Sequence, residues 1–133
     1  MADKKILIVE DNPVNRKLLV MVLRPHGYQI LTAVDGEEAL MIARQELPDL
    51  ILMDLQLPKM NGYTVTQLIK EQPATAGIPV VALTAHALAE EKDYAHQFGF
   101  TGYVTKPIDT RAFPEQVREF LSLSGKKQSS QQS

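Results

Sequence analysis

The sequence predicts an α/β fold: one doubly wound domain with a five-stranded parallel sheet and helices on both of its faces. Two observations support this prediction. Short apolar runs rich in β-branched and aromatic residues recur along the chain, and stretches with the apolar spacing of helices lie between them. The chain has 133 residues, of which 44% are hydrophobic and 23% charged, so it is long enough to bury a core and has an ordinary globular composition.

The predicted elements follow one another in regular alternation. The five apolar runs that we interpret as strands are residues 5–9, 28–34, 50–53, 79–85 and 102–105. Start and stop signals place the helices between them: Asn12-Pro13 opens the first helix and Asp35 with Glu38 resembles a capping box for the second. The other three helices are expected from Gly62 onward, from His86 to Phe98 before the stop at Gly99, and from Asp109 through Leu121.

Strands that alternate with helices form a parallel sheet with right-handed crossovers, which leaves few arrangements. We favour the flavodoxin-like strand order 2-1-3-4-5 with five helices. In this order a ligand binds where the carboxyl ends of strands 1 and 3 meet. The domain is expected to span residues 1–124, and the polar residues 125–133 are expected to form a disordered tail.

Composition argues against several classes of function. Fourteen basic and sixteen acidic residues give a net charge of -2 without a basic stripe, so nucleic-acid binding lacks its electrostatic footprint. No apolar run is long enough to cross a bilayer and no separate signal segment precedes the first strand, so we expect a cytoplasmic protein without membrane contact. The chain has no cysteine, which rules out disulfides and thiolate metal sites.

Three carboxylates are predicted to meet at the sheet edge where a ligand would bind. The apolar run that begins at Leu50 ends on Asp54, and Glu10 and Asp11 directly follow the first strand. Two unit charges about 5 Å apart repel by roughly 3 kcal/mol at an effective dielectric of about 20, so three ionised groups need a cation. Hard oxygen ligands of this kind suit Mg²⁺, with Mn²⁺ as the alternative.

Thr84 and Lys106 end the fourth and fifth strands at the same edge. Each of these residues has an ordinary explanation when taken singly: Asp54 as a turn residue, Thr84 as a strand former and Lys106 as a solvated charge. Together they provide a nucleophile, a metal site and a neutralising cation, which are the groups that phosphoryl transfer requires.

Four segments carry a resemblance to a known family. The stretches "ILIVEDN", "LILMDLQLPKMNG", "PVVALTA" and "GYVTKP" resemble the motifs of the response-regulator receiver domain of two-component signalling, in particular stand-alone receivers of the CheY and DivK kind. The resemblance covers about residues 4–123, and the spacings agree, with 30 residues from Asp54 to Thr84 and 52 from Asp54 to Lys106.

The resemblance implies a metal-dependent phosphoacceptor. Asp54 would be the nucleophile that takes a phosphoryl group from the phosphohistidine of a sensor kinase or phosphotransfer protein. Asp11, Asp54 and the backbone carbonyl of Gln56 would bind magnesium, and Glu10 would hold a metal-bound water. Lys106 would pair with a phosphoryl oxygen.

The resemblance also implies a conformational switch. Thr84 would donate its hydroxyl to the phosphoryl group beside the backbone amide of Ala85, and Tyr103 would swing inward when Thr84 moves. The Lys106-Pro107 bond would be cis, which costs only about 0.5–1 kcal/mol for an X-Pro bond. The residues alone leave the switch open, because a partly buried Tyr103 in a strand would look the same in a static protein.

Two further positions are candidates for tuning the lifetime of the phosphoryl group. Gln56 lies two residues after Asp54, and His86 lies two residues after Thr84. We hypothesise that their bulky polar side chains flank the route of the attacking water and change the hydrolysis rate. The alternative is that both side chains simply face solvent.

The expected output is a contact with another protein. In the family the fourth helix, fifth strand and fifth helix usually form the output face, which here carries Ala87, Leu88, Tyr94, Tyr103 and Phe113. Phe113 is the member of this set that we favour for the core. The oligomeric state is expected to be a monomer or a phosphorylation-dependent dimer.

Other functions remain as alternatives. The chain could drain phosphate from a kinase without an output of its own. A small phosphatase of the haloacid-dehalogenase kind also uses an aspartate at a strand end, but it needs a second Asp two residues later, where this chain has Gln56. A flavin carrier would need a phosphate-binding turn where "EDNPVN" places acid. We therefore expect a phosphoacceptor and not a multiple-turnover enzyme.

Overall fold

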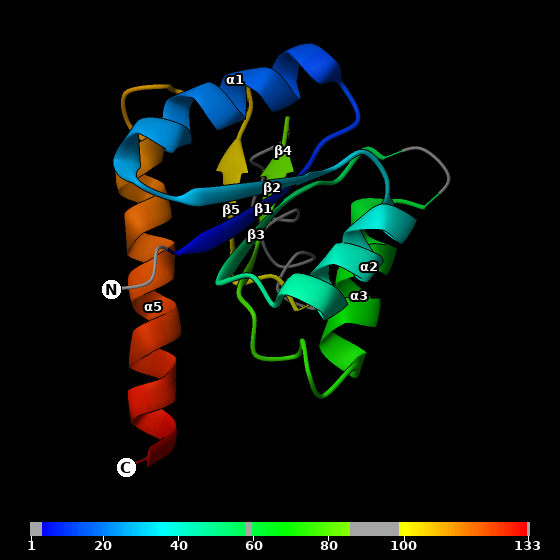
Figure 1. Cartoon of the computed structure of the whole chain (residues 1–133), viewed down its shortest axis with the longest axis vertical. Helices are drawn as coiled ribbons and strands as arrows, with labels where there is room; N and C mark the ends of the chain where they lie inside the picture. Colours follow the sequence, from blue (N-terminus) through cyan, green and yellow to red (C-terminus); the bar gives the residue numbers. More distant parts are fainter. Residues whose placement is uncertain (1–3, 58–59, 86–98, 133) are drawn as a thin grey trace.

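Five parallel strands form one sheet in the order β2-β1-β3-β4-β5, which confirms the predicted topology (Figure 1). The computed structural model describes residues 4–57, 60–85 and 99–132, and the side chains of residues 123–132 lie outside that description. The strands are β1 Lys5–Val9, β2 Gln29–Ala33, β3 Leu50–Asp54, β4 Val80–Thr84 and β5 Gly102–Thr105. The helices are α1 Pro13–Leu23, the short 3₁₀ helix η1 Arg24–His26, α2 Gly36–Glu46, α3 Gly62–Glu71 and α5 Phe113–Gln132.

Helices cover both faces of the sheet, so alternate strand residues enter two separate cores. On one face, Ile6, Ile8 and Leu52 pack with Leu19 of α1 and Phe113 of α5. The other face packs against α2 and α3, and its buried members include Leu7, Val9, Ile51, Met53, Ala43 and Val65. Phe113 is fully buried, as the sequence favours.

The strand register brings the polar residues after β1 and β3 to one level. Val9 pairs with Met53, so Glu10 lies beside Asp54, and Asp54 itself pairs with Leu83. Thr84 in turn pairs with Thr105, directly before Lys106. The register therefore aligns these groups along one edge of the sheet.

Side-chain caps begin the helices where the sequence places them. The Asn12 Oδ1 atom accepts hydrogen bonds from the N–H groups of Val14 and Asn15 at 2.9 and 3.1 Å. The carboxylate of Asp35 accepts from the Glu38 N–H at 2.9 Å. In a capping box the Glu38 carboxylate would accept from the N–H of Asp35. Here it accepts instead from the N–H of Val34, the residue before Asp35.

The strand bounds differ from the sequence predictions by one residue at most, whereas the last helix, expected from Asp109 through Leu121, runs from Phe113 to Gln132. The second and fourth strands are each one residue shorter at both ends, and β3 includes Asp54. The helix expected at 86–98 lies outside the described residues, so the fourth helix of the predicted fold stays a prediction. Strand ends depend on the hydrogen bonds of single residues, which apolar patterning does not specify.

The backbone of α5 is helical through Gln132 and extends past the rest of the domain (Figure 1). The sequence instead predicts disorder from Gly125, because the remaining residues are polar. A projecting polar helix end is supported by its own helical propensity and not by a core, and such ends are marginal in water. The boundary at residue 124 stays a prediction.

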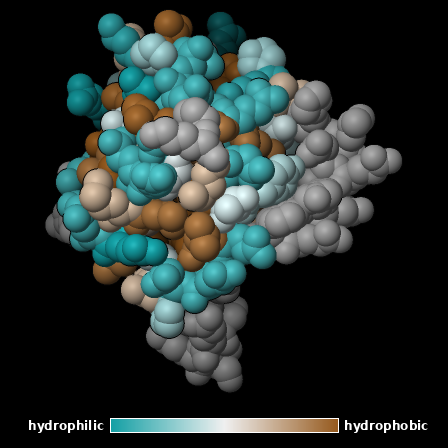
Figure 2. Space-filling model, turned by 90° about the vertical axis from the view of Figure 1, so that its right-hand side faces the viewer, coloured by the Kyte–Doolittle hydropathy of each residue, from teal (hydrophilic) through white to brown (hydrophobic). Residues whose placement is uncertain are grey.

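The side of the molecule that carries α2 and α3 shows an apolar area among polar side chains (Figure 2). Val34, Met41 and Leu47, in and around α2, are exposed apolar residues.

Across the described parts of the chain, no helix combines the length and apolarity that a bilayer crossing needs.

Candidate functional site

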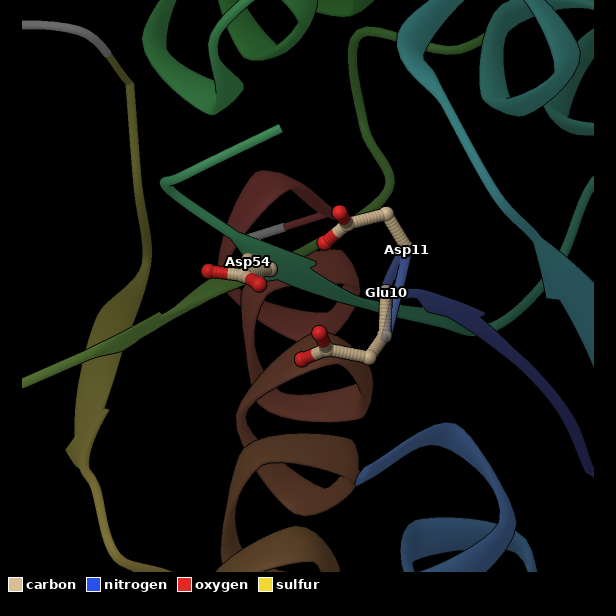
Figure 3. Close-up of side chains that lie close together, drawn as sticks. All are labelled: Glu10, Asp11 and Asp54. Atoms are coloured by element: carbon tan, nitrogen blue, oxygen red, sulfur yellow. The ribbon is translucent and has the colours of Figure 1, made fainter. Parts of the chain in front are cut away.

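Three carboxylates converge at the carboxyl ends of β1 and β3 (Figure 3). Glu10 and Asp11 reach in from the end of β1 and Asp54 from the end of β3, and one oxygen of each lies within 4.8 Å of the others. Glu10 and Asp54 are only 1% and 4% exposed, whereas Asp11 faces solvent. The predicted convergence is therefore confirmed, with the exposed carboxylate leaving an approach from solvent.

Lys106 bridges the two buried carboxylates. Its Nζ atom lies 3.1 Å from Oδ2 of Asp54 and 3.2 Å from Oε2 of Glu10. The backbone N–H of Lys106 donates to the carbonyl of Thr84 at 2.7 Å, which fixes the start of the loop after β5. The Lys106-Pro107 bond is cis, as expected.

The charges at the site perturb one another. Burial raises the pKa of Glu10, and Asp54 raises it further, against the opposing effects of Lys106 and of the Asn12 N–H. Burial by itself lowers the pKa of the Lys106 ammonium, but Asp54 and Glu10 outweigh this effect and the pKa is raised. The ammonium therefore stays charged, and an ionised Glu10 carries a cost.

Backbone amides hold the remaining oxygens of the buried carboxylates. The Asn12 N–H donates to Oε1 of Glu10 at 3.2 Å, and the Gln56 N–H donates to Oδ1 of Asp54 at 3.0 Å. Each buried carboxylate thus has one oxygen on an amide and the other on Lys106. This arrangement fixes both side chains, which favours a preorganised site.

A close backbone approach at Gly62 holds the loop after Asp54. The Gly62 N–H donates to the carbonyl of Leu55 at 3.1 Å. A Cβ atom on Gly62 would lie 2.5 Å from the backbone oxygen of Asp54 and 2.9 Å from Cα of Leu55, so a larger residue would displace the loop. Asn61 caps α3 by accepting from the N–H of Thr64 at 3.0 Å.

In the described part of the structure, two cavities adjoin the carboxylates. One, of about 220 Å³, is lined by Asp54, Gln56, Tyr63, Thr84, Ala85 and Lys106 among others. The second, of about 380 Å³, has mostly apolar walls from Leu18, Leu19, Pro107 and Ile108, and Glu10 and Lys106 also line it. Thr84 is 8% exposed and Gln56 is exposed. The first cavity therefore has Asp54, Thr84 and Lys106 in its walls.

The remaining predicted site residues are Tyr103, which the structure describes, and His86, which it does not. Tyr103 is partly buried and packs against the core on the α2–α3 side, an arrangement that suits a switch or a static residue equally. His86 lies outside the described residues, so its tuning role stays a hypothesis. The sequence reasoning missed Gly62 as a positioning residue, although a glycine directly after the Asn61 cap was an available signal. It also missed the contacts of Arg16, described below.

Comparison with known proteins decides the family. Residues 6–118 match the model of the response regulator receiver domain. The chain belongs to this family. It is 40% identical to the polar-differentiation response regulator DivK of Brucella anthropi over 118 residues, which cover 89% of this chain and 96% of DivK.

Solved receiver structures have the same fold. The chemotaxis protein CheY4 of Vibrio cholerae superposes with a TM-score of 0.85 at 28% identity, covering 90% of this receiver domain and 99% of CheY4. The receiver domain of a sensor histidine kinase from Pseudomonas aeruginosa gives a TM-score of 0.82 at 35% identity, covering 91% and 99% of the two chains. That neighbour has a magnesium ion coordinated in its active-site cleft.

The donor set of this receiver fits a hard divalent cation. Glu10, Asp11 and Asp54 offer only carboxylate oxygens, and magnesium binds through one or two carboxylates while it keeps several waters. The exposure of Asp11 leaves room for such waters. The acidic cluster can therefore hold a metal ion.

Proposed function

We propose that this receiver is a phosphoacceptor that takes a phosphoryl group from a phosphohistidine onto Asp54, with magnesium, and signals through protein contacts. The observation that carries the proposal is the geometry at the sheet edge. Asp54 is held between Lys106 and the Gln56 amide within 4.8 Å of the Glu10 and Asp11 carboxylates. A fixed nucleophile, a metal cluster and a charged lysine are the parts that phosphoryl transfer uses.

In the proposed reaction an oxygen of Asp54 forms a bond to phosphorus as the bond from phosphorus to the histidine nitrogen breaks. The leaving nitrogen keeps the electron pair of the broken bond. Lys106 would pair with a phosphoryl oxygen, and Thr84, which lines the same cavity, would donate its hydroxyl to another. Asp11, Asp54 and the Gln56 carbonyl would hold magnesium, with Glu10 acting through a water. When bound, the ion would neutralise part of the phosphoryl charge.

The decisive test uses a small phosphodonor. Incubation with acetyl phosphate and magnesium should add one acid-labile phosphoryl group per chain, measured as intact mass. The group should be absent in Asp54→Asn and when magnesium is chelated. Asp49→Asn is the matched control, because Asp49 lies at the opposite end of β3 and accepts from the Lys5 N–H. Modification that persists in Asp54→Asn would contradict the proposal.

We further propose that the phosphohistidine protein docks over α1. Val14, Leu18 and Met21 are exposed apolar residues of this helix, and Leu18 also lines the cavity that borders Glu10 and Lys106. Exposed apolar surface beside a reaction centre is typical of a protein contact. Met21→Glu should then slow transfer from a phosphorylated phosphotransfer protein and leave the reaction with acetyl phosphate unchanged. Equal slowing with both donors would count against this docking site.

The phosphoryl group is proposed to act by shifting a conformational equilibrium in which Thr84 and Tyr103 move together. Such a switch exists only if a partner binds one state better. The proposed output surface comprises segment 86–98, β5 and α5. Binding to a captured partner should therefore differ between the free protein and the protein carrying a beryllium fluoride mimic. Identical binding would favour a phosphate sink without its own output.

We propose a stoichiometric phosphoacceptor and not a multiple-turnover enzyme, acting in the cytoplasm as a monomer or a phosphorylation-dependent dimer. Gln56 and His86 would tune the lifetime of the phosphoryl group on Asp54. Gln56 is exposed and lines the cavity beside Asp54, where it could impede an attacking water. The decay of the phosphorylated protein should change in Gln56→Asn and in His86→Ala, and unchanged rates in both would refute the tuning hypothesis.

A further inference from the structure

Arg16, in the second turn of α1, reaches back over the loop that carries two of the three clustered carboxylates. Its Nη1 atom donates to the backbone carbonyl of Glu10 at 2.9 Å and to that of Asp11 at 3.3 Å. Both carbonyls lie beyond Val9, the last residue of β1, where the strand ladder has ended. The guanidinium of the half-buried residue Arg16 thus joins two successive peptide units of the candidate metal-binding loop.

The backbone of Arg16 ties the same loop to the helix. The Arg16 N–H donates to the carbonyl of Asn12 at 2.9 Å. Asn12 in turn caps α1 through its side chain and donates its own N–H to the Glu10 carboxylate. The loop from Glu10 to Asn12 is therefore fastened to α1 at every residue, and Arg16 supplies the contacts at Glu10 and Asp11.

Asp11 depends on this fastening more than its neighbours do. The Glu10 and Asp54 carboxylates are held directly by Lys106 and by backbone amides. For the exposed Asp11 carboxylate, the described part of the structure gives no hydrogen bond or ion pair, so its position follows from its backbone.

We infer that Arg16 is a positioning residue for magnesium, which holds the backbone of Glu10 and Asp11 so that the Asp11 carboxylate meets the Asp54 carboxylate. The inference rests on the proposed magnesium-dependent function. It concerns a residue that would not touch the metal, the phosphoryl group or the nucleophile. Its effect is transmitted through two carbonyl hydrogen bonds to the residue that does.

Charge and position predict opposite signs for the same substitution. Removing a cation near a cation-binding site, taken as charge alone, tightens metal binding, because like charges repel. Removing the two hydrogen bonds instead loosens a ligand and weakens binding. Outer contacts of this kind typically contribute 10–100-fold to metal affinity. A weakened affinity in Arg16→Met therefore cannot be explained by electrostatics.

The test is a calorimetric magnesium titration of the full chain and of three variants. Arg16→Met should bind magnesium about 10-fold more weakly than the unaltered protein. Arg16→Lys keeps the charge and a hydrogen-bonding nitrogen on a shorter side chain, so its affinity should lie between those two. Lys17→Met removes a charge from the next, exposed residue of α1 and should change the affinity less than about twofold, because an exposed charge is largely screened.

Thermal unfolding with a chelator provides the readout of fold, and it separates positioning from general destabilisation. Arg16→Met that stays folded and binds magnesium as tightly as the unaltered protein, or more tightly, would overturn the inference. If Arg16→Met does not fold, Arg16→Lys decides: affinity equal to that of the unaltered protein overturns the inference, and reduced affinity at equal stability supports it. Absence of binding by the unaltered protein would overturn the proposed function along with it.

Discussion

Replacing Lys106 by methionine should destabilise the metal-free protein and should increase the stability that magnesium binding adds. The Lys106 ammonium lies 3.1 Å from Asp54 and 3.2 Å from Glu10, and each attraction amounts to about 5 kcal/mol at an effective dielectric of about 20. The cost of burying the ammonium offsets part of this gain. Removing one partner of a buried ion pair typically costs about 3–5 kcal/mol. Because the Lys106 side chain is 25% exposed, we expect the lower end of this range, a loss of about 3 kcal/mol in the free energy of unfolding of the metal-free protein.

Magnesium should recover more stability in the variant than in the unaltered protein. Without Lys106, three carboxylate oxygens within 4.8 Å of one another have lost their cation, and a bound divalent ion would replace it. The ion no longer competes with a fixed ammonium, so its affinity rises. Each tenfold gain in affinity adds about 1.4 kcal/mol to the stabilisation at saturating metal.

Urea unfolding followed by circular dichroism, with chelator and with excess magnesium, measures both effects. Lys5→Met is the matched control, because Lys5 pairs with Glu46 at 3.5 Å while the two side chains are 35% and 42% exposed. Such a pair contributes less than about 1 kcal/mol, and its loss should not alter the response to magnesium. If Lys106→Met is as stable as the unaltered protein with chelator, or if magnesium stabilises it less, the reasoning about this site is wrong.

Three further predictions concern pH and stability. Burial raises the pKa of Glu10 above its ordinary value of 4.5, so folding favours the protonated carboxyl group. The free energy of unfolding of the metal-free protein should therefore fall as the pH rises through and above 4.5. Glu10→Gln should flatten this dependence in urea titrations at several pH values. Leu47 is exposed and has a φ of 47°, a left-handed backbone conformation that Asn tolerates better than Leu. Leu47→Asn should therefore raise the free energy of unfolding by about 0.5–1 kcal/mol, whereas Leu47→Ala should not raise it. The hydroxyl of Thr66 is buried without a hydrogen-bond partner in the described structure, so Thr66→Val should stabilise by about 1 kcal/mol. Thr75→Val should instead destabilise by about 1–3 kcal/mol, because the Thr75 hydroxyl donates to the Ile69 carbonyl at 2.6 Å; equal effects at the two threonines would contradict this reasoning.

The strand order and the meeting of the carboxylates could be predicted because both follow from patterning. Asp54, Thr84 and Lys106 each end or directly follow an apolar run, and parallel strands with helical crossovers bring such ends to one edge. The prediction needed no side-chain geometry. It depended only on which residues follow the buried runs and on the order of the strands.

Contacts made by long side chains could not be predicted in the same way. Arg16 lies on a helix and reaches back five and six residues to two carbonyls, and its many rotamers leave the sequence silent on that choice. The Gly62 approach depends on distances between backbone segments that only the folded loop defines. The Glu38 carboxylate accepts from the N–H of Val34 and not from that of Asp35, a choice between neighbouring amides that the capping-box pattern does not specify.

The energetics of the site follow from burying two of its three carboxylates. Glu10 and Asp54 are almost completely shielded from solvent, so other groups of the protein must compensate their charges. Lys106 supplies one positive charge for both, which leaves the cluster of three carboxylates net negative. That uncompensated charge lowers the stability of the metal-free fold, and a cation that relieves it binds with the free energy so released. Stability lost without metal and affinity gained for metal are therefore two measurements of one electrostatic term, which links the predicted behaviour of Lys106→Met to that of Glu10→Gln.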